Sequence, residues 1–104
     1  MATEAQIRAA LKNVLDPEIG VNIVDMGLIY GIEEKGGAVR VTATLTYPGC
    51  PLGQQIMDEI KAAVAALEGV KRVEVEITFN PPWDKDMMSQ DGRDELDLLR
   101  QSMY

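Results

Sequence analysis

The sequence predicts a two-layer α/β domain of order α-β-β-α-β, with both main helices on one face of a small mixed sheet and a short C-terminal helix. Two segments carry apolar residues at helical spacing, and three others alternate apolar and polar residues. In such a domain each helix buries one stripe against the same face of the sheet. A length of 104 residues suits one domain, so we expect residues 1–104 to form a single unit.

The first predicted helix begins after Thr3. Thr3 and Gln6, three residues apart, have the spacing of a capping box. The residues that follow place an apolar stripe on one side, formed by Ile7, Ala10, Leu11, Val14 and Leu15. Pro17 disfavours helical geometry at Asp16, so we expect the helix to end there and a loop to run on to Gly27.

Two strands are predicted next, over residues 28–34 and 38–47. Gly36-Gly37 between them is typical of a tight hairpin turn. In the second strand the apolar members are Val39, Val41, Ala43 and Leu45, and polar residues stand between them. This alternation predicts a sheet that is covered on one face.

The second predicted helix follows Pro48-Gly49-Cys50-Pro51 and closes at Gly69. Its apolar stripe consists of Leu52, Ile56, Ile60, Val64 and Leu67. The third strand covers residues 70–79 and ends at the Asn80–Asp84 segment. We expect a short helix from about Gln90, capped by Ser89, with Leu96, Leu99 and Met103 along one side.

Charge and composition exclude several classes of protein. The net charge is −7, from 17 acidic and 10 basic residues, which disfavours binding to nucleic acid and to anionic membranes. No apolar run approaches the roughly 20 residues that span a bilayer, and Met1–Ala10 lacks the apolar centre of a signal peptide. We therefore expect a cytoplasmic protein with no nucleic-acid or membrane partner.

Cysteine and histidine content narrows the chemistry further. The single cysteine, Cys50, cannot form an internal disulfide, which suits a reducing compartment. The chain has no histidine, so Ser-His and Cys-His catalysis and His-ligated zinc are excluded within it. These absences predict a protein that is not an enzyme.

Cys50 is the main candidate functional residue. Pro51 suits the first helical position, which would place Cys50 at or next to the N-cap of the second helix. Backbone N–H groups and the helix dipole stabilise a thiolate at that place, and a thiolate is the form that binds metal. The alternative is that Cys50 is a small buried residue that fills a turn.

Polar residues before Cys50 form a second group of candidates. The carboxylates of Asp16, Glu18 and Asp25 are hard oxygen ligands that could hold a metal, or they could instead bond to the backbone of their own loop. Thr44 and Thr46 lie on the polar face of the strand that leads to Cys50. Their hydroxyl groups could contact a thiolate or a cluster sulfide, or could simply suit an exposed strand.

The segment after the third strand contains an aromatic and a methionine pair. Trp83 follows two prolines, and it either packs over the edge of the core, covers Cys50 or docks a partner. Met87-Met88 is adaptable apolar surface.

Four motifs occur in order: Asp16-Pro17-Glu18, residues 22–30, residues 44–51 and Pro81-Pro82-Trp83. Together they resemble the SufT/PaaD-like metal–sulfur cluster assembly family, which includes the eukaryotic cytosolic iron–sulfur targeting factors. The resemblance implies an α/β domain with a role in maturing iron–sulfur proteins. It also implies that Cys50 is the functional thiol, with Asp16, Glu18, Asp25, Thr44 and Thr46 nearby. The phenylacetate-oxygenase branch adds a cysteine-bearing extension after this domain, so the sequence is more similar to the SufT-like branch.

The resemblance leads to a first hypothesis, in which the protein assembles or transfers an iron–sulfur cluster through Cys50. Clusters normally need about four thiolates, and this chain has one. We therefore expect a labile cluster or iron shared between chains, in a homodimer or with assembly proteins and client apoproteins, and no tightly bound cofactor. An adaptor that links assembly machinery to clients without binding metal is the alternative. A thiol enzyme is disfavoured, because no histidine activates Cys50 and no second cysteine resolves an intermediate.

Overall fold

The computed structural model describes residues 2–102, and their order of elements is the predicted α-β-β-α-β followed by a helix. The main helices are α1 (Glu4–Leu11) and α2 (Gly53–Ala65). The strands are β1 (Ile29–Lys35), β2 (Ala38–Ala43) and β3 (Arg72–Ile77). A single 3₁₀ turn, η1 (Lys85–Met87), precedes the last helix, α3 (Gln90–Ser102).

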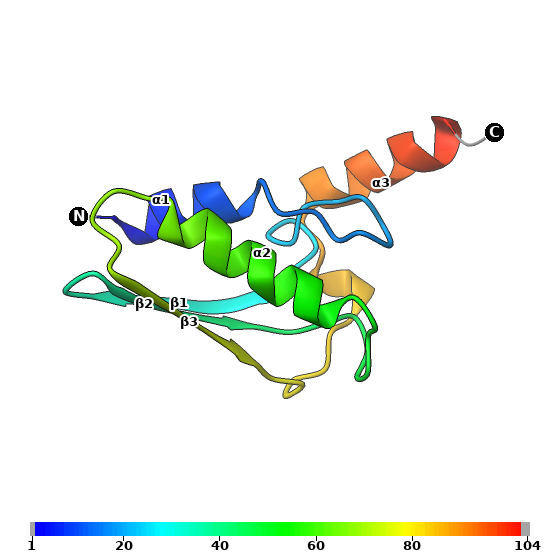
Figure 1. Ribbon diagram of the computed structural model, residues 1–104. Coiled ribbons are helices and arrows are strands. Elements are labelled where there is room, and N and C mark those ends of the chain that lie inside the picture. Colours follow the sequence, from blue (N-terminus) through cyan, green and yellow to red (C-terminus); the bar gives the residue numbers. More distant parts are fainter. Residues whose placement is uncertain (1, 103–104) are drawn as a thin grey trace.

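The three strands form a mixed sheet in the order β1-β2-β3. β1 and β2 are antiparallel, and the predicted turn between them uses Gly36 and Gly37 with φ of 61° and 90°. β3 runs parallel to β2, because α2 carries the chain back along the sheet between them. Both α1 and α2 cover the same face of the sheet, as predicted (Figure 1).

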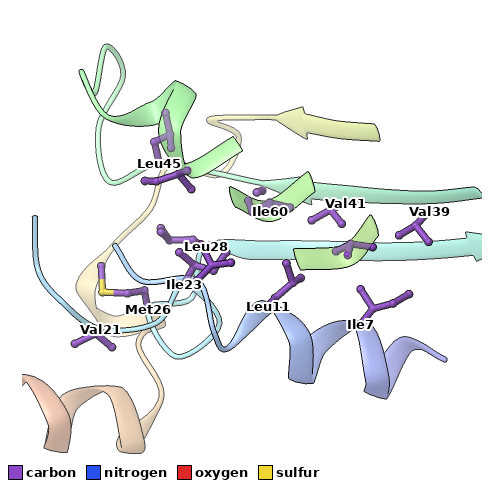
Figure 2. Close-up of a cluster of buried hydrophobic side chains, with 14 of the residues drawn as sticks. Ile7, Leu11, Val21, Ile23, Met26, Leu28, Val39, Val41, Leu45 and Ile60 are labelled. Atoms are coloured by element: carbon purple, nitrogen blue, oxygen red, sulfur yellow. The ribbon is translucent and has the colours of Figure 1, made fainter. Parts of the chain in front are cut away.

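The core lies between this face of the sheet and the two helices (Figure 2). Its side chains come from both helices, from the strands and from the loop that precedes β1. The fully buried members include Ile7, Leu11, Val21, Ile23, Met26, Leu28, Val39, Val41, Ile60 and Val64. The capping box of Thr3 and Gln6 is present at the start of α1, which fixes where this helix enters the core.

The first helix is shorter than the pattern predicts. α1 ends at Leu11, not at Asp16. Pro17 disfavours helical geometry only at Asp16, whereas Leu15 already forms a bridge with Asn22. The amide of Ile23 also donates to the carbonyl of Val14 at 2.9 Å. Pairing between residues 14–16 and 21–23 therefore replaces the last predicted helical turn.

The second strand is also shorter, and the second helix begins later. β2 ends at Ala43, and α2 begins at Gly53 with Leu52 as its N-cap. A Cβ on Gly53 would lie 2.8 Å from Leu45 Cδ1, so a residue without a side chain lets the helix pack closely on the core. Pro51 therefore belongs to the turn before the helix, and the prediction that it occupies the first helical position was wrong.

The segment after β3, residues 78–89, will be called the strap. It crosses from β3 to the loop that precedes β1, and α3 then projects from the body of the domain (Figure 1). Ser89 caps α3 as predicted, because its hydroxyl accepts from the amide of Gly92 at 3.0 Å. Leu96 is half-buried against the core, whereas Met103 lies outside the described residues. Within residues 2–102 no helix has the length and apolar character to cross a membrane.

Candidate functional site

Cys50 lies in a turn of residues 46–52 between β2 and α2, which will be called the Cys50 loop. Its side chain is half-buried and packs against the core. Gly49 has a φ of 82°, and the carbonyl of Cys50 accepts from the amide of Gly53 at 3.1 Å. Cys50 precedes the N-cap residue, Leu52, by two positions. It therefore lies in the turn before α2 and does not cap the helix.

Glu18 is the carboxylate that lies beside this thiol. The Cys50 thiol donates to Glu18 Oε1 at 3.6 Å, and the Tyr47 hydroxyl donates to the same oxygen at 3.3 Å. Tyr47 is 43% exposed. The site is thus a small group at the surface, in which one carboxylate oxygen accepts from a thiol and from a phenol.

Asp16 holds Glu18 in this position without itself facing solvent. Only 4% of Asp16 is exposed, and its Oδ1 accepts from the amides of Glu18 at 2.9 Å and Ile19 at 3.2 Å. These bonds close the turn that begins at Pro17. Asp16 therefore bonds to the backbone of its own loop, which was the predicted alternative to metal binding.

The environment of Tyr47 shifts its acidity. Desolvation by surrounding protein atoms is the largest cause that raises the pKa of Tyr47 above its ordinary value of 10.0. The nearby Glu18 and Cys50 raise this pKa further, because an additional negative charge next to them is unfavourable. Tyr47 therefore stays a neutral hydrogen-bond donor at neutral pH.

Asp25 belongs to a different cluster, formed with Asn22 and Ser89. Its Oδ2 accepts from Asn22 Nδ2 at 2.7 Å, and its Oδ1 accepts from the Ser89 hydroxyl at 2.8 Å. The Asp25 carbonyl also accepts from the Ser89 amide at 2.8 Å. Gly92 packs so closely that a Cβ on it would lie 2.7 Å from the Asp25 carbonyl oxygen. Asp25 therefore fastens the start of α3 to the loop before β1.

These contacts also explain the acidity of Asp25. The hydrogen bond from Asn22 is the largest cause that lowers its pKa from the ordinary value of 3.8. Partial burial opposes this, while Ser89 and the charge of Lys12 lower the pKa further. Of the three predicted carboxylates, the structure brings Glu18 to Cys50 and gives Asp16 and Asp25 backbone and side-chain partners elsewhere.

Thr44 and Thr46 differ from one another. Thr44 is 1% exposed, so its predicted place on an open polar face was wrong. The backbone there is bonded on both sides, because the Thr44 amide donates to Leu28 O at 2.8 Å and the Thr78 amide donates to Ala43 O at 2.9 Å. The Thr44 hydroxyl donates weakly to Leu45 O at 3.4 Å. Thr46 is half-buried at the start of the Cys50 loop.

Trp83 packs over the edge of the core, which was one of its predicted roles. Its indole N–H donates to the carbonyl of Met26 at 2.7 Å. The methionine pair divides, because Met88 is buried and Met87 is exposed. Trp83 therefore fixes the strap against the loop before β1.

Sequence reasoning missed Tyr47 as a neighbour of the thiol and Asn22 with Ser89 as partners of Asp25. Tyr47 stands three residues before Cys50, so an aromatic at the start of the same turn was the available signal. Nothing in the sequence links Ser89 to Asp25, because 64 residues separate them. Between Ala2 and Ser102, no three Cys, Asp or Glu side chains are grouped so that they could hold a metal ion.

Comparison with known proteins decides the family. The sequence profile described as "Iron-sulfur cluster assembly protein" matches residues 4–77, which include Glu18, Asp25 and Cys50. The chain belongs to this family. The resemblance drawn from the four motifs is thereby confirmed.

Relatives of known name support the same assignment. The chain is 48% identical over 90 residues to the "Fe-S protein maturation auxiliary factor YitW" of Bacillus subtilis, covering 86% of this chain and 88% of the relative. It is 44% identical over 100 residues to a "Fe-S protein maturation auxiliary factor" of Porphyromonas gingivalis, covering 95% of both chains. A crystal structure of a domain of unknown function from Bacillus anthracis has a TM-score of 0.85 and 35% identity, covering 90% of this chain and 91% of that one.

Proposed function

We propose that this protein is an auxiliary factor in the maturation of iron–sulfur proteins, and that it passes iron or a cluster to client apoproteins through Cys50. The family assignment and the names of the relatives support the general role. The observation that carries the role of the thiol is its contact with Glu18, because the chain's single cysteine has a carboxylate within 3.6 Å at the surface.

The proposed chemistry begins with the loss of the thiol proton. Iron binds a thiolate, so the Cys50 proton must leave when the sulfur–iron bond forms. The thiol already donates to Glu18 Oε1, which makes this carboxylate the proton acceptor or a second donor to iron. Asp16 fixes the turn that carries Glu18, and Tyr47 donates to the same oxygen. We assign Asp16 a positioning role.

The count of donor atoms implies that the cargo is shared. Cys50 and Glu18 supply one sulfur and one carboxylate, whereas a cluster is normally held by about four thiolates. Thiols of a second copy, of an assembly protein or of a client must then supply the rest. A cluster held in this way is labile, which suits transfer better than storage. The thiols at the acceptor end belong to the client apoprotein.

Three finer points complete the proposal. The role is that of a carrier and not of an enzyme, and the free thiol suits the reducing cytoplasm. Thr46 stays a candidate for contact with cluster sulfide, because it is half-buried at the start of the Cys50 loop. Asp25 and Thr44 have other hydrogen-bond partners, so we give them structural roles.

Anaerobic reconstitution with iron and sulfide, followed by native mass spectrometry, tests this proposal. We expect the wild-type protein to carry iron and sulfide only in species with at least two chains, or with one chain and a small thiol. Cys50→Ser should lose this species and Glu18→Gln should weaken it, whereas Glu59→Gln, an exposed glutamate of α2, should match the wild type. A cluster that Cys50→Ser binds equally well would disprove the role of the thiol. Absence of any cluster on the wild-type protein, together with full activity of Cys50→Ser in cells, would favour the adaptor.

A further inference from the structure

The face of the sheet opposite the helices carries a hollow that shares no residue with the Cys50 site. It has a volume of about 680 Å³ and is lined by residues that include Ile29, Tyr30, Thr42, Glu76, Thr78 and Met87. In residues 2–102 no helix covers this face of the sheet (Figure 1). Volumes of about 300–1,000 Å³ are usual for ligand sites.

The strand register places a residue without a side chain next to the hollow. Gly31 of β1 stands opposite Thr42 of β2, and Thr42 stands opposite Glu76 of β3. The next row along the sheet contains Glu33, Arg40 and Glu74, all with long side chains. Gly31 has none, so no side chain from this position covers Thr42, which lines the hollow. A Cβ on Gly31 would point toward Thr42, at 3.8 Å from its Cβ.

The strap forms the opposite wall and is held in place. The Tyr30 hydroxyl donates to the Pro81 carbonyl at 2.9 Å, and the Trp83 indole donates to Met26 O at 2.7 Å. Met87 and Pro81 present apolar surface from this wall, and Ile29 adds more from β1. The hollow is therefore formed before any ligand arrives, which lowers the cost of binding.

The charge around the hollow selects the ligand. Glu76 lines it and is exposed, and among its described lining residues none is Lys or Arg. The nearest cation of the neighbouring row, Arg40, is paired with Glu74 at 3.5 Å. Hydroxyl groups of Thr42, Thr78 and Tyr30 provide acceptors beside the carboxylate.

We propose that this hollow binds an arginine-bearing segment of a partner polypeptide. A guanidinium offers several N–H donors in one plane, which suits the Glu76 carboxylate and the neighbouring hydroxyls. Its aliphatic stem and an adjacent apolar side chain would pack on Ile29, Pro81 and Met87. A second copy of this chain is disfavoured as the occupant, because each copy carries a net charge of −7.

Gly31→Leu tests the hollow directly. Its φ is not in the left-handed region, and its Cβ would make an ordinary contact with Thr42, so the substitution adds a side chain beside this lining residue without backbone strain. Replacing glycine inside a strand also removes an entropic cost, so we expect no loss of stability. Ala62→Leu, on the exposed face of α2, is the matched control.

Binding is measured by titrating ¹⁵N-labelled protein with the tripeptide acetyl-Leu-Arg-Leu-amide. We expect saturable amide shifts at Tyr30, Gly31, Thr42 and Glu76. Gly31→Leu should abolish these shifts, and Glu76→Gln should weaken binding about tenfold, while Ala62→Leu and Glu59→Gln bind as the wild type does. Should Gly31→Leu fail to fold, Glu76→Gln alone carries the test.

Each of the following results would overturn the proposal. Shifts that do not saturate or that lie on another surface would exclude the hollow as the site. Wild-type affinity in Gly31→Leu would show that the shape of the hollow does not determine binding, and wild-type affinity in Glu76→Gln would show that its charge does not. Equal binding of acetyl-Leu-Glu-Leu-amide would exclude arginine recognition, and equal binding of arginine amide would exclude a peptide. If the same amide signals shift when the protein is diluted in the absence of peptide, the protein self-associates through the hollow, and a second copy is the occupant.

Discussion

The Cys50 loop and the Asp25 loop, residues 22–27, both carry polar residues of the four motifs, yet they are built differently. In the Asp25 loop the Asn22 side chain donates to Asp25 Oδ2 at 2.7 Å and accepts from the Asp25 amide at 2.9 Å, and Asp25 Oδ1 accepts from the Ser89 hydroxyl at 2.8 Å. In the Cys50 loop, residues 47–49 are exposed, and the side-chain bonds of Tyr47 and Cys50 to Glu18 are longer, at 3.3 and 3.6 Å.

This difference separates two uses of polar residues that the sequence presents as one group. Where polar side chains of a partly buried loop are joined by short hydrogen bonds, as Asn22, Asp25 and Ser89 are, they hold the fold together. Where a thiol and a carboxylate meet at the surface through a long bond, they can exchange that partner for another. We therefore expect substitutions in the Asp25 loop to change stability, and substitutions in the Cys50 loop to change function.

Gly27→Ala should have the largest effect on stability, and Gly49→Ala is its matched control. Both glycines have a φ of 82°, so the backbone strain of about 1–2 kcal/mol is common to the two variants. At Gly27 the new Cβ would collide with the carbonyl of Met87, whereas at Gly49 it would meet nothing within 4 Å. Urea denaturation should therefore show Gly27→Ala to be the less stable of the pair by about 2 kcal/mol. Equal losses of stability in the two variants would mean that the strap shifts away from residue 27 at no free-energy cost.

Asp25→Ala should have the next largest effect. It removes hydrogen bonds to a charged group from Asn22 and Ser89, and should lower the free energy of unfolding by about 2 kcal/mol at pH 7. The exposed Asp97 on α3 gives a control, Asp97→Ala, which should change it by less than about 0.5 kcal/mol.

The same variant has a defined pH dependence. The pKa of Asp25 is lowered in the folded protein, so the ionised carboxylate stabilises the fold above its unfolded value, near 3.8. This stabilisation is lost as the pH falls below that value and through the folded pKa. Urea denaturation across this range should show a steeper loss for the wild type than for Asp25→Ala. Parallel curves would rule out the inferred role of Asp25.

The smallest expected effect concerns Tyr47. Glu18→Gln removes one of the causes that raise the Tyr47 pKa, so this pKa should move down toward 10.0 while desolvation keeps part of the shift. Absorbance of the phenolate against pH measures the change, and Tyr47→Phe identifies which titration belongs to Tyr47. Glu59→Gln should leave the curve unchanged. No movement in Glu18→Gln would mean that the two side chains are apart in solution.

Local patterns predicted most of the fold. The Thr3–Gln6 capping box, the Gly36-Gly37 turn and the Ser89 cap each depend on residues close in sequence, and the structure confirms all three. The end of α1 could not be predicted in the same way. It depends on pairing of residues 14–16 with 21–23, a tertiary arrangement that competes with helical propensity.

The site was predicted less completely, because proximity between distant segments decides it. Glu18 reaches Cys50 across 32 residues, and Asp25 reaches Ser89 across 64. Residue type alone could not separate these two carboxylates, since both stand in one polar loop among apolar neighbours. The alternation of the strand placed Thr44 on an exposed face, but Thr44 lies beyond the end of β2, where its amide donates to Leu28 O, and only 1% of it is exposed.

Maturation of an iron–sulfur enzyme in cells tests the role of Cys50 most directly. A host that lacks its own factor of this family is supplied with the wild-type chain, with Cys50→Ser or with Ser89→Ala, at matched protein levels. We expect Cys50→Ser to leave the activity of a [4Fe–4S] dehydratase at the level of the empty host, although the variant folds. Ser89→Ala removes the cap of α3 and one bond to Asp25 but leaves the Cys50 loop intact, so it should restore activity in proportion to the folded protein present. Full rescue by Cys50→Ser would contradict a function that acts through the thiol.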